Sequence, residues 1–146
     1  MYHRVLLPTD GSPGAETATE QALDVAERFD AALHVLFVVD TNALPLDGRS
    51  KVVFDQLNDD GRRSVESVVE HAEERGIDPV VREVLGGSPH EVILEYVEEH
   101  GIDLVVMGTH GRRGLSRYLL GSVTERVVRS SDAPVLVVRR TESTGA

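Results

Sequence analysis

Glycines recur at short intervals in the segment from Val105 to Val128, VVMGTHGRRGLSRYLLGSVTERVV. They occupy positions 108, 111, 114 and 121 and follow an apolar run that ends at Met107. Because glycine lacks a Cβ, the chain at positions 108 and 111 can adopt positive φ angles and approach a ligand closely. Gly121-Ser122 then leads into a predicted helix, whose free N–H groups and dipole attract anions. This order of features favours a phosphate-binding loop.

Positive charge is concentrated in the same part of an acidic chain. The net charge is -10, and seven of the fifteen lysines and arginines lie between Arg112 and Arg140. The segment has no Gly-Lys-Ser/Thr, and no G-x-G-x-x-G follows the first apolar run, so neither a Walker A loop nor a dinucleotide fold is indicated. The residues alone predict an anion or nucleotide site; a plain flexible loop, with Ser122 only capping a helix, is the alternative.

Composition narrows the class of protein. The acidic balance argues against a nucleic-acid or anionic-membrane partner. No apolar run reaches the ~20 residues of a membrane span, and no leader segment is recognisable, so we expect a cytoplasmic protein. The absence of cysteine excludes disulfides, thiolate metal sites and cysteine nucleophiles. A single lysine among fifteen basic residues fits either a salt-adapted cell or a GC-rich genome.

Hydrophobic periodicity predicts the strands and helices that position the glycine segment. Five short apolar runs predict strands within residues 3–10, 32–40, 79–85, 102–108 and 133–140. Four helical patterns alternate with them, and this order is typical of a parallel sheet covered on both faces. Residues 1–140 are predicted to form one α/β domain, and residues 141–146 a polar tail.

Local signals mark the ends of the predicted helices. Ser12 is an expected N-cap with Pro13 at the first helical position. Capping boxes are expected at Ser88 and at Ser122, the latter with Glu125 as its glutamate. The second helix is expected to end at Gly76, and the third near Gly101. Gly61 falls on the apolar stripe of the second helix, which indicates either a kink or a close packing contact.

Three predicted strands end in residues that could meet a ligand. They are Pro8-Thr9-Asp10, Val38-Val39-Asp40 and Met107-Gly108. In open parallel sheets, ligands bind beyond the carboxyl ends of the strands, where the strand order reverses. The glycine segment directly follows the last of these ends.

The spacing Gly108-x-x-Gly111, nine residues, Gly121-Ser122 resembles the ATP-binding signature of the universal stress protein family. The segments VLLPTDGS, HVLFVVD and PVLVVRR extend the resemblance along the whole chain. It implies a single doubly wound domain whose five-stranded parallel sheet has the order 3-2-1-4-5. It also implies that ATP, ADP or AMP, with Mg²⁺ or Mn²⁺ as an accompanying cation, lies over the first and fourth strands.

The resemblance assigns residues to the parts of the nucleotide. Asp10, with Pro8 and Thr9 beside it, is implied near the adenine and ribose, and the backbone of Val38 against the adenine. The residues implied to line the ribose and phosphates are Met107, Gly108, His110, Gly111, Arg112, Gly121, Ser122, Val123 and Thr124. Gly114 is not part of the family signature, which leaves the contacts of Arg112 and Arg113 open.

Several of these side chains have a structural alternative. Asp10 could cap the next turn instead of contacting the nucleotide. Asp40 is interpreted as a solvated loop residue, with a divalent cation shared with Asp10 as the alternative. His34 lies within an apolar run and is expected in the core or at a sheet edge. His110 lies inside the motif and could meet a phosphate through its backbone or its ring. The remaining histidines, His3, His71, His90 and His100, lack ligand spacing, and no metal site is assigned to them.

The leading functional interpretation is a nucleotide-binding module that acts through nucleotide-dependent conformation or partners. No catalytic residue is assigned, because no general base or nucleophile–base pair is evident. A slow ATPase or a nucleotidyl-handling enzyme on the same scaffold is the alternative. A two-component receiver is excluded, since the third strand ends without an aspartate and Lys51 is the only lysine.

We also expect a homodimer through the fifth strand. This strand lies at a sheet edge in the implied order, and Val135, Leu136, Val137 and Val138 leave that edge apolar. An apolar edge strand invites pairing with another chain, and family members that this chain resembles dimerise in this way.

Overall fold

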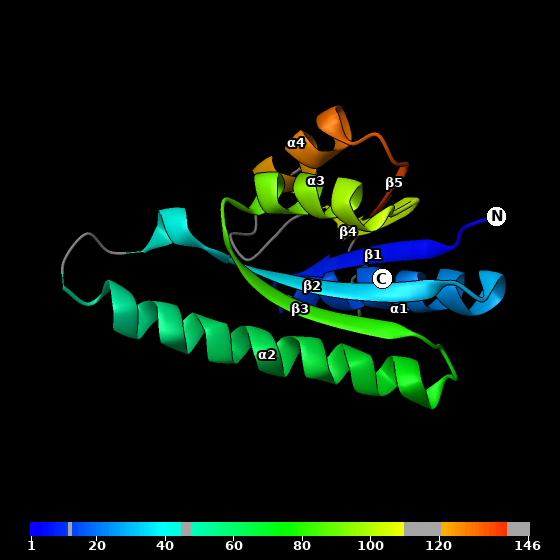
Figure 1. Cartoon of the computed structure of the whole chain (residues 1–146), viewed down its shortest axis with the longest axis horizontal. Helices are drawn as coiled ribbons and strands as arrows, with labels where there is room; N and C mark the ends of the chain where they lie inside the picture. The colour runs from blue at the N-terminus through cyan, green and yellow to red at the C-terminus, as the bar shows by residue number, and fades with distance from the viewer. Residues whose placement is uncertain (12, 45–47, 110–120, 140–146) are drawn as a thin grey trace, which may run out of the picture.

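Five parallel strands form a single sheet in the order β3-β2-β1-β4-β5, as predicted (Figure 1). The structure is a computed structural model that describes residues 1–11, 13–44, 48–109 and 121–139. Neighbouring strands β1 and β2 pair along their length, from Arg4 with Ala32 to Thr9 with Phe37. The strands are β1 (Arg4–Thr9), β2 (Ala32–Asp40), β3 (Val80–Gly87), β4 (Leu104–Gly108) and β5 (Val135–Val138).

Helices cover both faces of this sheet. One face carries α1 and α2, and the other carries α3 and α4 (Figure 1). A short 3-10 helix follows β2. The bounds are α1 (Pro13–Phe29), η1 (Thr41–Ala43), α2 (Ser50–Glu74), α3 (Pro89–His100) and α4 (Ser122–Ser130). None of the helices in the described ranges combines the length and the apolar character needed to cross a bilayer.

The strands are near-continuous apolar runs because both of their faces are buried. Successive residues alternate between two cores: Leu7 and Val35 face α1 and α2, whereas Leu6 and Leu36 face α3 and α4. All four side chains are fully buried, and burial of one such side chain contributes roughly 1.5–3 kcal/mol. The sheet is therefore a rigid platform whose strand ends have fixed positions.

Some predicted helix ends are confirmed and others are wrong. Helix α1 begins at Pro13, and Gly101 ends α3 in the left-handed conformation with φ 61°. Ser88 is the N-cap of α3, but its side chain makes no capping bond and its Oγ lies 3.4 Å from Nδ1 of His90. The predicted capping box there is wrong. Ser12 lies outside the described residues.

The fourth helix begins at the predicted residue but is capped differently. Gly121 is the N-cap and Ser122 is the first helical residue, so Ser122 does not cap the helix. Glu125, expected to complete a capping box, instead pairs with Arg129 one turn later, at 2.9 Å. Ser122 is therefore an exposed residue at the start of the helix.

Gly61 makes a close packing contact with the sheet. It is buried in the middle of α2, over the ring of Phe37 in β2. A Cβ at this position would lie 2.5 Å from Cδ1 of Phe37, closer than two carbon atoms can approach. The glycine therefore sets the distance between α2 and the sheet, and the close-contact prediction is confirmed.

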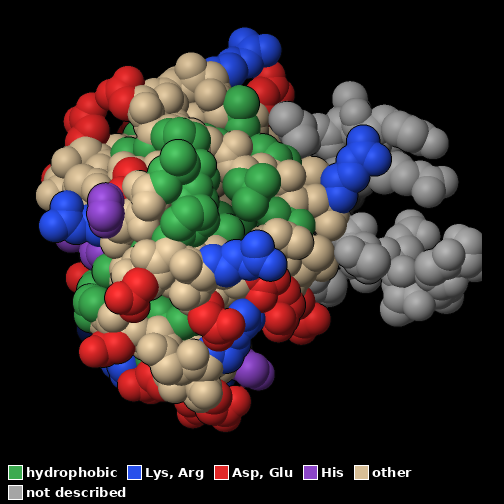
Figure 2. Space-filling view, turned by 90° about the vertical axis from the view of Figure 1, so that its right-hand side faces the viewer, with side chains coloured by type: hydrophobic (Ala, Val, Ile, Leu, Met, Phe, Trp, Pro, Cys, Tyr) green, Lys and Arg blue, Asp and Glu red, His purple; other side chains and the backbone are tan. Residues whose placement is uncertain are grey.

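The amino-terminal ends of the strands lie at the right of Figure 1. Seen from that side, hydrophobic side chains gather in the middle of the face and acidic ones gather below them (Figure 2). Tyr2 and Phe29 belong to this end and pack edge to face with ring centroids 5.2 Å apart. Clustered acidic side chains repel anionic ligands, so this end does not suit a phosphate-bearing molecule.

Candidate functional site

The predicted site residues that the structure describes gather at the carboxyl ends of β1, β2 and β4 and at the start of α4. These ends lie at the left of Figure 1, opposite the chain's amino terminus. We call this set the strand-end site. Its members are Pro8, Thr9, Asp10, Val38, Met107, Gly108, Gly121, Ser122, Val123 and Thr124. His110, Gly111 and Arg112 lie outside the described residues, as do Arg113 and Gly114.

The ladder between β1 and β4 stops before the strands end. The two strands pair only at Val5 with Leu104 and at Leu6 with Val105. Each strand continues for three residues beyond the last pair, without a ladder partner on the other. Strand β1 is also where the order of the sheet reverses, because β2 and β3 lie on one side of it and β4 and β5 on the other. Ligands of open parallel sheets bind at such a switch point.

The end of β1 turns sharply after a buried threonine. Thr9 is buried, and its Oγ1 accepts a hydrogen bond from the Gly11 N–H at 3.3 Å. Gly11 has φ 75°, a conformation that favours glycine. Asp10, between them, is half-buried. Asp10 therefore directly follows the end of β1, within this turn.

The end of β2 contributes an apolar wall and a structural aspartate. Val38 is half-buried and packs against the core under α3 and α4. Oδ1 of Asp40 accepts a hydrogen bond from the Asn42 N–H at 2.9 Å and so caps η1. Within the described residues, no three histidine or acidic side chains come close enough to hold a metal ion.

The residues on either side of the 110–120 segment meet at its base. The Gly121 N–H donates to the Thr109 carbonyl at 2.7 Å, and the Thr124 hydroxyl donates to the Gly108 carbonyl at 2.9 Å. The Thr109 N–H donates in turn to the Val138 carbonyl of β5 at 3.1 Å. We call these three hydrogen bonds the loop neck. They place the amino end of α4 directly against the end of β4.

The first turn of α4 presents different groups on its two sides. Ser122 is exposed and Val123 is half-buried. Thr124 is buried, and its hydroxyl is occupied by Gly108. This hydrogen bond was not predicted from the sequence. Thr124 and Val127 are three residues apart, so both lie on the buried side of the helix. The N–H groups of Ser122 and Val123 lie in the first turn of the helix and have no intrahelical acceptor.

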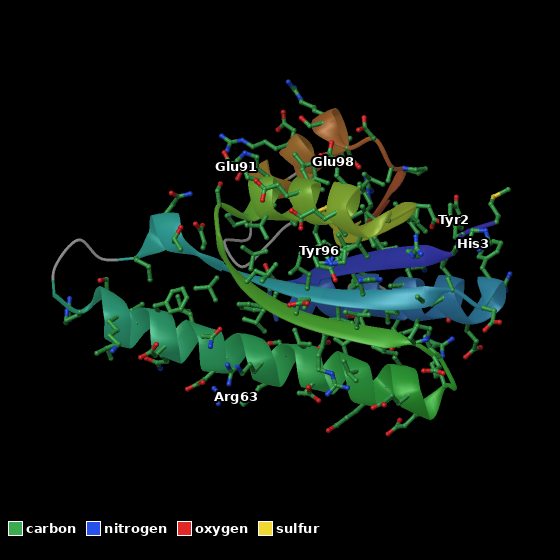
Figure 3. The ribbon with its side chains drawn as sticks, viewed as in Figure 1. Tyr2, His3, Arg63, Glu91, Tyr96 and Glu98 are labelled. Carbon is green, nitrogen blue, oxygen red and sulfur yellow. The ribbon has the colours of Figure 1, made fainter. Side chains whose placement is uncertain are left out.

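The side chains with shifted pKa values lie away from the strand-end site. His34 is buried in the amino-terminal half of β2, and its Nδ1 lies 2.7 Å from the Tyr96 hydroxyl of α3. Figure 3 shows Tyr96 between α3 and the sheet. Burial, together with the positive charges of His100 and Arg4, lowers the pKa of His34 to about 4. Burial and the nearby Glu83 raise the pKa of Tyr96 to about 12. His34 is a satisfied core histidine, as expected.

A groove on the α3–α4 face offers a contrasting surface. Its volume is about 220 Å³, and Glu95, Glu98 and Asp132 line it beside Leu94 and Val97. Three carboxylates at its rim would repel the phosphates of a nucleotide. None of the predicted site residues belongs to this groove, so the strand-end site remains the candidate for anion binding.

Comparison with known proteins gives a consistent result. The model of the universal stress protein family matches residues 1–139. The chain is 38% identical over 143 residues to Universal stress protein MJ0531 of Methanocaldococcus jannaschii, covering 96% of this chain and 84% of that protein. The solved structure of MJ0577 from the same organism is 32% identical, with a TM-score of 0.85 over 98% of this chain and 99% of that one. Universal stress protein UspA of Lactobacillus plantarum, 28% identical, has a TM-score of 0.82 over 94% and 98% of the two chains.

Proposed function

Because the chain belongs to the universal stress protein family, we propose that it binds an adenine nucleotide, ATP in the first place, at the strand-end site. In this proposal it acts in the cytoplasm as a nucleotide-dependent module of the stress response. The nucleotide changes the conformation or the partners of the protein, and hydrolysis is not its main task.

The observation that carries the proposal is the end of the β1–β4 ladder beside a helix amino terminus. The last three residues of each strand have no ladder partner on the other strand, whereas β1 and β2 pair along their whole length. The loop neck places the first turn of α4 at the same spot. A nucleoside between the strand ends would therefore have its phosphates near the N–H groups of α4, whose dipole favours negative charge.

Different residues could contact the nucleoside and the phosphates of such a ligand. Val38, which is half-buried, could supply apolar surface for a purine ring, and the Asp10 carboxylate could accept hydrogen bonds from ribose hydroxyls. The exposed Ser122 hydroxyl and the N–H groups of Ser122 and Val123 could donate to phosphate oxygens. The nucleoside would thus depend on the strand ends and the phosphates on α4.

Two other structures with this fold hold adenine nucleotides. One is a universal stress protein in complex with cAMP, 24% identical, and the other is an Arabidopsis thaliana protein of the family with AMP bound, 20% identical; both have a TM-score of 0.73. At these identities the likeness extends to the fold alone. They support the proposal by showing that this fold can accommodate an adenine nucleotide.

The proposal also includes a homodimer through β5. This strand forms one edge of the sheet, and Leu136 at its centre is 38% exposed. Pairing with β5 of a second subunit would satisfy the free backbone groups of the edge and cover Leu136.

Calorimetric titration with ATP tests the proposed site through Gly121→Val. Gly121 has φ -63° and ψ 152°, which valine can adopt, so the change acts through its added side chain. Gly121 is buried where α4 begins, and a branched side chain there should weaken ATP binding by well over tenfold, at about 1.4 kcal/mol per decade.

The matched control is Gly48→Val, because nothing lies within 4 Å of a Cβ at Gly48. That variant should bind ATP like the wild type. If Gly121→Val stays folded and also binds ATP normally, the strand-end site is not where the nucleotide binds.

A further inference from the structure

The loop neck ties together the two parts of the strand-end site that would hold different parts of a nucleotide. Gly108 and Thr109 end β4, and Gly121 and Thr124 begin α4. Two of its hydrogen bonds join these segments directly, from Gly121 to Thr109 at 2.7 Å and from Thr124 to Gly108 at 2.9 Å. The relative position of β4 and α4 at the site therefore depends on these two bonds.

Thr124 is the only side chain that takes part in the loop neck. Its exposed fraction is 4%, so its hydroxyl has lost contact with water and needs a protein partner. The partner is the Gly108 carbonyl, sixteen residues earlier in the chain. A hydroxyl in the first turn of a helix could instead bond to its own helix, but this one reaches across to the strand. Thr124 thus fastens α4 to β4.

The resemblance to the family implies that Thr124 lines the nucleotide, whereas the hydrogen bond indicates an indirect role. A threonine hydroxyl has one proton to donate, and Gly108 receives it. The Gly121 N–H is likewise occupied by Thr109. The first donors of α4 that have no intrahelical acceptor are the N–H groups of Ser122 and Val123, and beside them lies the exposed Ser122 hydroxyl.

We propose that Thr124 is a positioning residue of the nucleotide site. By donating to Gly108, it fixes the distance between the strand ends, which hold the nucleoside, and the first turn of α4, which holds the phosphates. This inference rests on the proposed function. Loss of the hydroxyl releases α4 from β4, so a ligand that contacts both parts is weakened more than one that contacts the strand ends alone.

The test compares Thr124→Val, which keeps the shape of the side chain but lacks the donor, with Thr124→Ser, which keeps the donor. Binding of ATP and of adenosine is measured by calorimetry. Thr124→Val should weaken ATP binding at least fivefold and adenosine binding less than twofold. Thr124→Ser should bind ATP within about twofold of the wild type, because its hydroxyl can still reach Gly108.

A matched control separates this effect from a general loss of stability. The Thr19 hydroxyl donates to the Ala15 carbonyl at 2.7 Å, which is also a threonine-to-carbonyl bond but lies within one helix, α1, and away from the site. Thr19→Val should leave ATP binding unchanged. If Thr124→Val does not fold, Thr124→Ala takes its place, since it also removes the donor without adding volume.

A second measurement reports on the loop neck without any ligand. Hydrogen exchange of the Gly121 amide, followed by NMR, should be at least tenfold faster in Thr124→Val than in the wild type. Normal ATP binding by Thr124→Val, equal weakening by Thr124→Ser, or unchanged exchange at Gly121 would each overturn the inference. If the wild type binds no adenine nucleotide, the proposed function fails, and the exchange rates still decide whether Thr124 holds the neck.

Discussion

His34 and Thr124 are polar side chains buried at two different junctions between elements. Their exposed fractions are 7% and 4%, and each is satisfied across the junction, His34 by Tyr96 of α3 and Thr124 by the end of β4. A buried polar group that loses its partner costs roughly 1–3 kcal/mol. At the scale of single residues, we therefore expect His34 and Thr124 to tolerate little change.

The first prediction concerns the pH dependence of stability. The pKa of His34 is about 4 in the folded protein, against an ordinary value of 6.5, because burial, His100 and Arg4 disfavour its charged form. The unfolded chain then binds more protons between these two values, so stability falls as the pH drops through this window. Urea unfolding should give a free energy roughly 2–3 kcal/mol lower at about pH 4.5 than at about pH 7 from this group.

The variant His34→Gln isolates that contribution. Glutamine can keep a hydrogen bond to the Tyr96 hydroxyl but does not titrate, while the carboxylates of the chain titrate as before. The pH profile of His34→Gln should be flatter between about pH 5 and about pH 7. Parallel profiles for the two proteins would show that His34 does not carry the dependence.

The second prediction concerns Asp10. A carboxylate that accepts hydrogen bonds from the nucleoside contributes equally to every ligand that has the same nucleoside. Asp10→Ala should therefore weaken ATP and AMP by the same factor, about tenfold, in calorimetric titrations. Loss of affinity for ATP alone would place Asp10 at the phosphates or at their cation instead.

Asp40→Asn is the matched control for Asp10. Asparagine keeps an oxygen for the cap on Asn42 but removes the negative charge. Because Asp40 is a cap in the structure, this variant should bind ATP like the wild type in the presence of Mg²⁺. A loss specific to Mg²⁺-ATP would instead support a cation between the two aspartates.

At the scale of elements, the sequence predicts the strands well because parallel strands buried on both faces are unbroken apolar runs. Their ends are less well predicted: β4 begins at Leu104 rather than at residue 102, since Asp103 accepts hydrogen bonds from the N–H groups of His3 and Arg4. The loop neck could not be predicted, because a threonine hydroxyl has many possible acceptors and only the folded chain brings Gly108 to it. The two predicted capping boxes are wrong: the Ser88 side chain makes no capping bond, and Glu125 pairs with Arg129 instead.

The third prediction tests the contact between α2 and β2. Alanine favours a helix over glycine by about 1 kcal/mol, but a methyl group at Gly61 would collide with the buried ring of Phe37. Overpacking costs about 1–3 kcal/mol, and an overlap this close to a buried ring should cost the upper part of that range, about 2–3 kcal/mol. After the helix gain is subtracted, Gly61→Ala should lower the free energy of unfolding by about 1–2 kcal/mol. Urea denaturation is the measurement.

Two further variants check the cause of that loss. Gly48→Ala has open space around the new methyl group and should change stability by less than about 0.5 kcal/mol. Adding Phe37→Leu to Gly61→Ala should recover part of the lost stability, because the smaller side chain relieves the collision. If Gly61→Ala is as stable as the wild type, α2 does not depend on this close approach.

At the scale of the whole molecule, the two edge strands of the sheet each carry a similarly exposed leucine but differ in the charged side chains beside it. Leu136 on β5 is 38% exposed, and Leu85 on the opposite edge strand β3 is 37% exposed. Strand β3 also carries Arg82, which pairs with Glu66 of α2 at 2.7 Å, and charged side chains on an edge discourage strand pairing. The described part of β5 has no charged side chain between Val135 and Val138. We therefore expect association at β5 and not at β3.

The fourth prediction follows from this difference. Leu136→Lys should convert a dimer into a monomer, because it places a charge at the centre of the proposed contact. Leu85→Lys introduces the same charge at the same exposure on the other edge and should leave the dimer intact. Sedimentation velocity at micromolar concentration distinguishes these results, and a wild type that sediments as a monomer would contradict the proposed dimer.

The central claim is that the strand-end site holds an adenine nucleotide, and native mass spectrometry of freshly purified, undialysed protein tests it most directly. Spectra are recorded before and after addition of ATP to the wild type and to Gly121→Val. We predict a wild-type species whose mass is increased by one adenine nucleotide per subunit, and a Gly121→Val species without this increase. A wild type that shows no nucleotide-bound species even with ATP in large excess, or a Gly121→Val that retains one equally, would contradict the claim.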